Sequence, residues 1–410
     1  MLHKQFSSGW TGLLVFSAVI LSNALYAGAA SRYQVLHSFG NGRDGAGVWN
    51  GMAVDGQDNL YGVTTGGGAY GYGTVFELMR RSGGTWTETV LHNFCQHFPR
   101  CSDGTVQWDT PVLDSQGKLY GFSTAGLFQM TPGPHGWSFS LIDGNSRSNS
   151  YLPPNNAPDL CDLLMGKRGH LYDPCFSLGK NYHGAVSELS HGSGGWTEND
   201  LYDFCPTGYT CLDGAYPAYQ LTWDPAGNLY GVTIEGGTDK YGVAFQLEHT
   251  AGGWKEHVLY DFPAYIPGSS LTFDSAGNLY GTTFQEGSCD GTVYQLSPQG
   301  KGRWKRTILY PFCNAEQNGG APVEPVTFDP KTGVLYGTAS AGGDPVCQCG
   351  VIFKLTPGKS GKWEYTVLHK FHGPDGVGPN GLTIDAKGNL YGTTVAGGKY
   401  GYGVAFEFTP

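Results

Sequence analysis

Apolar and polar residues alternate along most of the chain, in short runs that end at turns rich in glycine, proline and aspartate. Between residues 219 and 262 the alternation is clear, because turns such as "DPAGN" separate the runs. This pattern predicts four short strands, which we name A to D in chain order: Tyr219–Trp223, Leu229–Thr233, Gly242–Leu247 and Trp254–Phe262. Four antiparallel strands of this kind form one blade of a β-propeller.

A Leu-Tyr pair marks the start of strand B and recurs along the whole chain. Successive copies are separated by 59, 52, 58, 50, 56 and 55 residues. A repeat of this length is typical of propellers and solenoids, whose units cannot bury their own apolar face alone. The sequence therefore predicts seven blades, which begin strand B at Leu60-Tyr61, Leu119-Tyr120, Leu171-Tyr172, Leu229-Tyr230, Leu279-Tyr280, Leu335-Tyr336 and Leu390-Tyr391.

The two ends of the chain indicate how the array closes. The last repeat stops at "GVAFEFTP", directly after its strand C, whereas Arg32–Phe39 ("RYQVLHSF") matches the strand D of other repeats, such as "TETVLHNF". An N-terminal strand that completes the last blade would close a ring and leave no long exposed edge. We therefore expect an all-β, seven-bladed propeller with four antiparallel strands per blade, closed by the N-terminal strand in blade 7.

The recurring words "NLYGVTTGGGAYGYGTVFEL" (Asn59 to Leu78) and "NLYGTTVAGGKYGYGVAFEF" (Asn389 to Phe408) resemble the GloVer (Gloeobacter–Verrucomicrobia) tandem repeat of exported bacterial proteins. The resemblance covers nearly the whole of residues 30–410, and it implies the propeller fold but no established activity. Members often carry a C-terminal sorting anchor, whereas this chain ends at Pro410 inside its final blade. That departure favours a freely secreted or periplasmic product.

Residues 1–29 differ in composition from the rest of the chain. Lys4 precedes the apolar run Gly12–Leu21, and small residues follow at Ala27–Ala30. This order is typical of a secretory signal peptide, with a retained anchor helix as the alternative. We expect residues 30–410 to form a single propeller domain, secreted or periplasmic, with no membrane span after cleavage.

Composition narrows the classes of partner. The chain has 66 glycines among 410 residues, and a net charge of −10 with only 14% charged residues. Glycine supplies the positive φ angles that many tight turns need. No basic stripe is available to displace counterions from nucleic acid, so we expect no nucleic-acid partner. We also expect a monomer without cofactor or metal.

Ten cysteines in an exported chain predict disulfides rather than thiol chemistry. Two pairs enclose short loops of similar length and lack zinc-site spacing. Cys161 and Cys175 fall opposite each other on strands A and B of blade 3, and Cys289 and Cys313 flank one blade. Cys347 and Cys349 could pair locally or with other partners. The two loop pairs are Cys95 with Cys101 and Cys205 with Cys211.

Two recurring polar residues have structural interpretations. An aspartate that opens six of the seven A–B turns can accept hydrogen bonds from backbone N–H groups two residues on, and each turn offers too few oxygens for calcium. His37, His92 and His369 exchange with tyrosine in strand D of different blades, which indicates packing rather than a shared metal. The aspartates are Asp55, Asp114, Asp224, Asp274, Asp329 and Asp385.

Blade 3 departs from the repeat. It lacks the turn aspartate, and Tyr172 is followed by Asp173 rather than by glycine. An aberrant repeat is either a place where function was added or the result of sequence drift. The sequence leaves both interpretations open.

The B–C and D–A loops lie on one face of a propeller, and here they vary in length and composition while the A–B turns are short and uniform. Variable loops on a rigid scaffold usually carry function. Aromatic and polar loop residues suit stacking on sugar rings or contact with a protein. We therefore predict a recognition protein that binds a polysaccharide or a surface protein through Trp49, Asn50, Tyr70, Trp108, Tyr216, Tyr265, Asn380 and Tyr400.

A polysaccharide-degrading enzyme with its site at the mouth of the central channel is the alternative. A glycoside hydrolase needs two carboxyl groups beside the scissile bond, and a lyase needs a base with a cation such as Lys240 or Arg100. No pair stands out by motif. The candidate catalytic residues are Asp109, Glu316, Glu324 and Asp375, with Tyr219 or His372 as the base of a lyase. A structural envelope component is a third possibility, against which the irregular loops weigh.

Overall fold

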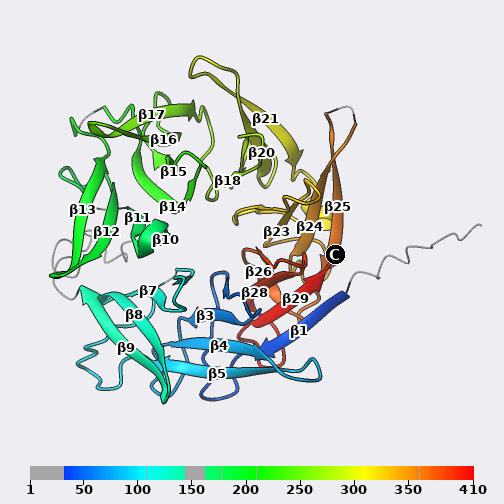
Figure 1. Ribbon diagram of the computed structural model, residues 1–410. Coiled ribbons are helices and arrows are strands. Elements are labelled where there is room, and N and C mark those ends of the chain that lie inside the picture. Colours follow the sequence, from blue (N-terminus) through cyan, green and yellow to red (C-terminus); the bar gives the residue numbers. More distant parts are fainter. Residues whose placement is uncertain (1–31, 108, 144–161, 177, 209, 360) are drawn as a thin grey trace, which may run out of the picture. The chain divides into compact units, whose positions relative to one another are not determined.

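A computed structural model describes residues 32–107, 109–143, 162–176, 178–208, 210–359 and 361–410. These residues form seven antiparallel sheets arranged in a ring, with hardly any helix (Figure 1). No helix in this part of the chain is long and apolar enough to cross a membrane. The predicted signal peptide lies outside the described residues and stays a prediction.

Each sheet is one blade, and its strands follow the order A-B-C-D from the ring axis outward. The A strands of blades 1–7 are β2 (Ala53–Val54), β6 (Val112–Leu113), β10 (Leu164–Met165), β14 (Ala215–Trp223), β18 (Thr272–Phe273), β22 (Thr327–Phe328) and β27 (Thr383–Ile384). The B strands are β3 (Leu60–Thr64), β7 (Leu119–Ser123), β11 (Leu171–Cys175), β15 (Leu229–Glu235), β19 (Leu279–Thr283), β23 (Leu335–Ala339) and β28 (Leu390–Ala396).

The two outer strands of each blade are longer. The C strands are β4 (Thr74–Arg80), β8 (Gly126–Gly133), β12 (Ala185–Gly192), β16 (Val243–Thr250), β20 (Thr292–Pro298), β24 (Val351–Pro357) and β29 (Val404–Thr409). The D strands are β5 (Trp86–Asn93), β9 (Gly136–Asp143), β13 (Gly195–Asp203), β17 (Gly253–Asp261), β21 (Trp304–Pro311), β25 (Trp363–Lys370) and β1 (Arg32–Ser38). Three short elements complete the described chain: β26 (Val377–Pro379), which pairs with β28, the helical turn α1 (Ala315–Asn318) and the 3-10 turn η1 (Lys167–Gly169).

Blade 7 combines both ends of the described chain, as the sequence predicted. Strand β1 pairs with β29 in antiparallel register from Arg32 opposite Thr409 to Ser38 opposite Val404, and the two strands lie side by side in Figure 1. The Tyr33 ring stacks on His369 of blade 6, with 4.0 Å between ring centroids. The ring closure is therefore confirmed.

The sequence Leu-Tyr-Gly in strand B has a packing reason. Opposite Gly392 in β28 stands Phe406 of β29, and a Cβ on that glycine would lie 2.5 Å from the tip of the phenyl ring. The same relation holds in blade 1 between Gly62 and Phe76, at 2.4 Å. Glycine in strand B therefore makes room for an aromatic ring from strand C, and the pair fills the interior of the blade.

The turn aspartates do what the sequence predicted and one thing more. One carboxylate oxygen of Asp385 accepts the backbone N–H groups of Lys387 and Asn389 at 2.8 Å. The other oxygen accepts the Asn389 side-chain amide at 2.8 Å and the hydroxyl of Tyr391 at 3.3 Å. The aspartate therefore ties the A–B turn to the tyrosine of the Leu-Tyr pair, a contact that the sequence did not indicate.

The disulfides agree with the predicted pairs wherever both partners are described. Cys175 is also disulfide-bonded, and its predicted partner Cys161 lies outside the described residues. Cys347 and Cys349, whose partners the sequence left open, are bonded to each other. The described pairs are Cys95–Cys101, Cys205–Cys211, Cys289–Cys313 and Cys347–Cys349.

Candidate functional site

Exposed large apolar side chains gather on one face of the ring. Of the twelve in the described residues, two lie on outer strands, Val258 in β17 and Ile308 in β21. The other ten all belong to B–C or D–A loops, and none belongs to an A–B or C–D turn. These ten are Trp49, Tyr70, Phe98, Tyr182, Leu212, Tyr241, Ile266, Phe284, Val346 and Tyr402. We call the surface that these loops form the loop face.

The loops of this face are anchored to the blades by a repeated contact. At each described D–A junction, a histidine or tyrosine near the end of strand D bonds to a residue in the loop that follows. His369 Nε2, for example, lies 2.9 Å from Asp375 Oδ2. The other pairs are His37–Asp44, His92–Asp103, Tyr202–Asp213, Tyr260–Tyr265 and Tyr310–Asn318. The recurring histidines thus hold loops in place.

Asp375 was a candidate catalytic residue, but its carboxylate serves this anchor. Besides His369, it accepts the backbone N–H of His372 at 2.7 Å. Burial alone would raise the pKa of Asp375, but these hydrogen bonds outweigh it and hold the pKa below its usual range. A carboxylate held ionised in this way suits anchoring better than proton donation.

The tightest group of predicted ligand residues lies where blade 7 meets blade 1. Three glycine-rich loops converge there, residues 40–50, 65–73 and 397–403. Ala46 and Gly66 exchange two backbone hydrogen bonds of 2.8 and 2.9 Å, and the N–H of Gly47 donates to the carbonyl of Tyr402 at 3.2 Å. The repeated words of the sequence thus become neighbours, because ring closure places the first blade beside the last.

These three loops carry four of the eight predicted ligand residues. Trp49 and Tyr70 are each 43% exposed, and Tyr402 beside them is 54% exposed. Lys399 lies 5.0 Å from the ring centroid of Tyr400, and the carbonyl of Asn50 accepts the hydroxyl of Thr393 at 2.6 Å. We call this group the 7–1 cluster. It offers aromatic faces, hydroxyls and one cation on a hydrogen-bonded backbone.

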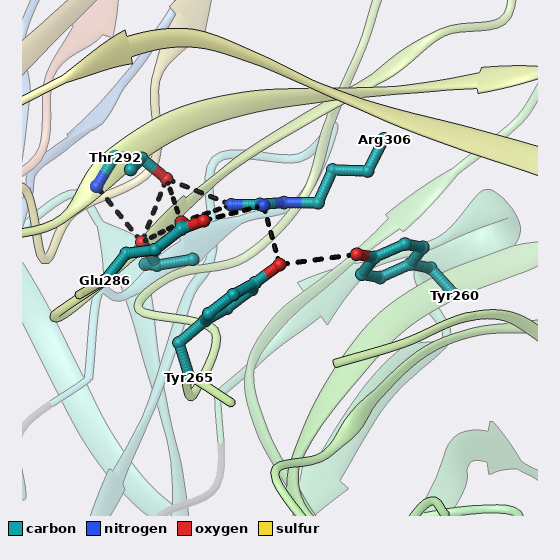
Figure 2. Close-up of polar contacts among 6 residues, drawn as sticks. Tyr260, Tyr265, Glu286, Thr292 and Arg306 are labelled. Carbon is teal, nitrogen blue, oxygen red and sulfur yellow. Dashed lines mark hydrogen bonds and ion pairs between the residues drawn. The ribbon is translucent and has the colours of Figure 1, made fainter. Parts of the chain in front are cut away.

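Tyr265 is used inside the protein instead. Its hydroxyl accepts a hydrogen bond from Arg306 Nη1 at 2.7 Å and lies 3.3 Å from the hydroxyl of Tyr260 (Figure 2). The same guanidinium forms a bidentate pair with Glu286, at 3.0 and 2.5 Å, and also donates to Thr292. The Arg306 side chain is 7% exposed. This network joins blades 4 and 5, so the half-buried Tyr265 acts as a link between blades rather than as a ligand contact.

Two other predicted ligand residues, Asn380 and Tyr216, are used in contacts between blades. Asn380 is 4% exposed, and its amide donates to the carbonyl of Val48 and to the Thr393 hydroxyl, both at 2.9 Å. It therefore connects blade 7 to the loop that enters blade 1. Tyr216 stacks on Phe176 at 4.6 Å between blades 3 and 4. Trp108 lies outside the described residues.

A second group of predicted residues meets at the ring axis. Asp109, Tyr219 and Glu324 are corresponding residues of blades 2, 4 and 6. Each lies two residues before the strand-A residue whose side chain packs into the interior of the blade. Asp162 of blade 3, which the sequence analysis missed, lies close enough to Glu324, Tyr219 and Asp109 to raise the pKa of each. Because blades 3 and 6 stand across the ring from each other, these side chains converge around its axis. We call them the axial cluster.

Burial raises the pKa of every acid in the axial cluster. Burial raises the pKa of Asp162 to about 6, and burial together with the Asp162 charge raises that of Glu324 to about 8. Burial also raises the pKa of Asp109, which is 1% exposed. Its Oδ2 accepts the N–H of Phe122 at 2.8 Å, while Oδ1 has no hydrogen-bond partner within the described residues. Carboxylic acids that stay neutral near pH 7 can donate protons.

Tyr219 has an unusual backbone. Its φ is +65°, in the left-handed region that bulky residues rarely occupy, where β14 loses register with β15. Such strain is often found at functional sites. An alignment of the seven repeats at the start of strand A would have shown that Asp109, Tyr219 and Glu324 occupy corresponding positions. Asp162 lies one residue after that position in the irregular blade 3, so the alignment would have missed it.

The remaining catalytic candidates are not drawn into the axial cluster. Glu316 is exposed in α1, and His372 is exposed and bonds to Asp344 at 3.1 Å. Arg100 and Lys240 are exposed on loops, and neither is among the groups that shift the pKa of Tyr219. The base and cation of a lyase are therefore not brought together by these residues.

The repeat can now be compared with known families. Residues 266–410, from the loop before blade 5 to the end of blade 7, match the family model described as the Gloeobacter/Verrucomicrobia repeat. Residues 266–410 carry this repeat. The resemblance seen in the sequence is thereby confirmed for these residues. No curated protein matches the chain in sequence.

Solved structures share the propeller fold of this chain at low sequence identity. A puromycin hydrolase is 15% identical with a TM-score of 0.53, over 86% of this chain and 50% of its own, so the chain spans half of that enzyme. YCF48 from Cyanidioschyzon merolae is 12% identical with a TM-score of 0.53, over 92% and 99%. A fungal alcohol oxidase solved with copper is 14% identical with a TM-score of 0.53, over 93% and 77%. Identities this low show the fold alone.

Proposed function

We propose that this protein is an exported recognition protein that binds a macromolecular partner through its loop face. The observation that carries the proposal is the one-sided distribution of exposed apolar side chains, ten of twelve on that face. Soluble proteins rarely expose such residues together unless the surface is an interaction site. Disulfides in and beside these loops support a secreted or periplasmic location, where such bonds persist.

A protein surface is the partner that this composition favours over a polysaccharide. Leu212, Ile266 and Val346 offer no polar group and no flat ring, and Val346 is 92% exposed. Sugar recognition uses aromatic rings with hydrogen-bonding groups, whereas protein interfaces combine aromatic and aliphatic side chains. The 7–1 cluster, with its aromatic anchors on a fixed backbone, is the expected centre of the interface.

Site-specific photo-crosslinking tests the proposal. A benzoyl-phenylalanine replaces Trp49 in one variant and Val258, which is exposed but lies on an outer strand, in the matched control. After irradiation with the envelope and secreted fractions of the producing cells, position 49 should yield a discrete protein adduct and position 258 none. Equal adducts from both positions, or none from position 49, would contradict the proposal. Retardation in gels cast with polysaccharides, lost on Trp49→Ala, would instead assign the loop face to sugar.

The axial cluster supports a second candidate, a glycoside hydrolase. Burial and the Asp162 charge raise the pKa of Glu324 to about 8, as a general acid requires, and Asp162 supplies a second carboxyl group near it. Clearing of a polysaccharide gel around the protein band would reveal cleavage, and Glu324→Gln should lower that rate at least a hundredfold. If no polymer is cleared, the carboxyl groups of the cluster are not catalytic toward those substrates.

A further inference from the structure

On the face opposite the loop face, the A–B turn of blade 3 differs from the other A–B turns. In blade 4 the A–B turn reads Asp-Pro-Ala-Gly-Asn, whereas in blade 3 the corresponding residues 166–170 are Gly-Lys-Arg-Gly-His. All the other A–B turns begin with aspartate. Blade 3 therefore replaces an acidic turn by one with two cations, in a chain whose net charge is −10.

The lost carboxylate is replaced by a different set of contacts. A Cβ on Gly166 would lie 2.4 Å from the ring of Tyr172, so this ring occupies the space where an aspartate side chain would start. The hydroxyl of Tyr172 donates to Glu188 Oε1 instead, and His170 Nδ1 lies 2.8 Å from the same oxygen. These hydrogen bonds outweigh the burial of Glu188 and lower its pKa. Its charge is thus already partnered within the blade.

The altered turn of blade 3 lines a cleft that blades 3 and 4 form together. The cleft has a volume of about 690 Å³ and is lined by the A–B turns of both blades and by the start of β17. That volume lies within the range of small-molecule sites. Within the described residues, neither Lys167 Nζ nor the Arg168 guanidinium has a hydrogen-bond or ion-pair partner, and both side chains are exposed at its rim.

Two tryptophans form the opposite wall. In blades 1, 2, 3 and 6, the tryptophan of strand D packs edge-on against the strand-B tyrosine of the preceding blade, as Trp137 does against Tyr61 at 5.7 Å. Here Trp223 takes that contact with Tyr172 at 4.8 Å. Trp254 lies beyond it, 6.5 Å from Trp223 and 4.9 Å from His249. The Trp223 Nε1–H has no hydrogen-bond acceptor within the described part of the chain.

Trp223 is specific to blade 4. The corresponding residues of the other blades are Val54, Leu113, Met165, Phe273, Phe328 and Ile384. Among the described residues, an exposed cation pair, two indole rings and an unpaired indole N–H therefore meet only at this junction. Asp224 is the other acid of the cleft, and it is occupied by its own turn, since it accepts the Asn228 backbone and side-chain N–H groups and the Tyr230 hydroxyl.

We infer that this cleft binds an anionic pyranose, with a carboxylate-bearing sugar of a uronic-acid polymer as the expected source. The indole rings supply flat faces for the apolar side of a sugar ring. Arg168 and Lys167 supply the cations, and a guanidinium matches a carboxylate in geometry. The site lies on the face opposite the loop face, so it stands or falls independently of the proposed protein interface.

Calorimetric titration of the whole protein with tetragalacturonate tests the inference. Binding to wild type is expected, with the neutral galactose tetrasaccharide at least tenfold weaker. The double variant K167Q/R168Q and the variant W223L should each weaken tetragalacturonate binding at least tenfold. Leucine occupies the Trp223 position in blade 2, so W223L is compatible with the fold. Thermal melting checks the folding of each variant.

The matched control is K331Q/K387Q, which removes two cations from A–B turns of blades 6 and 7 on the same face. It should bind tetragalacturonate within twofold of wild type. A sulfated galactose tetrasaccharide could bind more tightly than tetragalacturonate and lose its affinity in the same variants. That result would support the anionic-sugar site and identify sulfate, rather than carboxylate, as the group that it recognises. No binding of either anion, equal binding of the neutral sugar, or equal losses in the control would overturn the inference.

Discussion

Blade 7 is assembled from strands at opposite ends of the described chain, and blade 3 comes from nearby segments, yet blade 7 is the regular one. In blade 7, Gly392 faces Phe406 and Asp385 ties its turn to Tyr391. In blade 3, Asp173 stands opposite Ser187, and Gly166 replaces the turn aspartate. Each departure is matched by another, because the glycine is needed only where an aromatic ring lies opposite. Paired side chains thus hold a blade together. When both members of such pairs are replaced together, as in blade 3, the blade keeps its fold while its surface residues change.

The largest effect should come from removing the strand that closes blade 7. Deletion of Arg32–Phe39 should lower the free energy of unfolding by at least about 5 kcal/mol, because Phe39 is fully buried and truncation of a buried phenylalanine alone costs about 3–5 kcal/mol. Urea unfolding, followed by tryptophan fluorescence, measures the loss against a control chain that begins at Ser31. An unchanged unfolding midpoint would mean that closure by β1 does not hold the ring together.

A smaller effect should come from removing the turn aspartate of blade 7, which blade 3 lacks. Asp385→Ala removes four hydrogen bonds and should cost about 1–2 kcal/mol at pH 7. Burial would raise the pKa of Asp385, but the hydrogen bonds from Asn389 and Lys387 lower it overall. A lowered folded-state pKa stabilises the protein above the unfolded pKa of about 3.9, and the stabilisation disappears as pH falls through the folded value.

The cost of Asp385→Ala should therefore shrink between pH 5 and pH 2. Unfolding curves of both proteins across that window measure the difference. A cost that stays constant to pH 2 would show that the ionised carboxylate is not what holds the turn.

The smallest effect should have the opposite sign and should fall in blade 3. Arg168 has a φ of +64°, which costs a side-chain-bearing residue about 1–2 kcal/mol and glycine little. Arg168→Gly should raise the free energy of unfolding by about 0.5–1 kcal/mol, after the greater freedom of glycine in the unfolded chain is deducted. Lys167→Gly, at a position without positive φ, is the control and should not stabilise. A loss of stability on Arg168→Gly would show that the arginine contributes contacts of its own.

The repeat made the fold predictable. The Leu-Tyr-Gly pattern recurs at a constant place in each blade, and the missing strand D of the last repeat has its match at Arg32–Phe39. The loop face was predictable for the same reason, because variation stands out against a repeat. Of its predicted ligand residues, Trp49 and Tyr70 are exposed there, whereas Tyr265 and Asn380 are used in contacts between blades.

What the sequence could not predict depends on contacts across the ring. Asp162 and Glu324 lie more than 160 residues apart, and only the closed ring brings them together. In the sequence, Arg306 resembles any exposed cation of an outer strand. Only the structure shows that the loop carrying Glu286 covers it and forms an ion pair with it. Trp223 belongs to a plain apolar strand, and its partner turn lies on the face whose turns are otherwise uniform in sequence. Charge, rather than length, distinguishes the turn of blade 3.

The pairing of β1 with β29 also has a consequence for how the protein is made. The first strand of the described chain finds its partner in the last one, so β1 must wait, as synthesis proceeds, until Thr409 has been added. In that interval an unpaired strand edge is open to wrong partners, including other copies of the chain. Completion of the ring therefore depends on the last described strand, however early the first one is made.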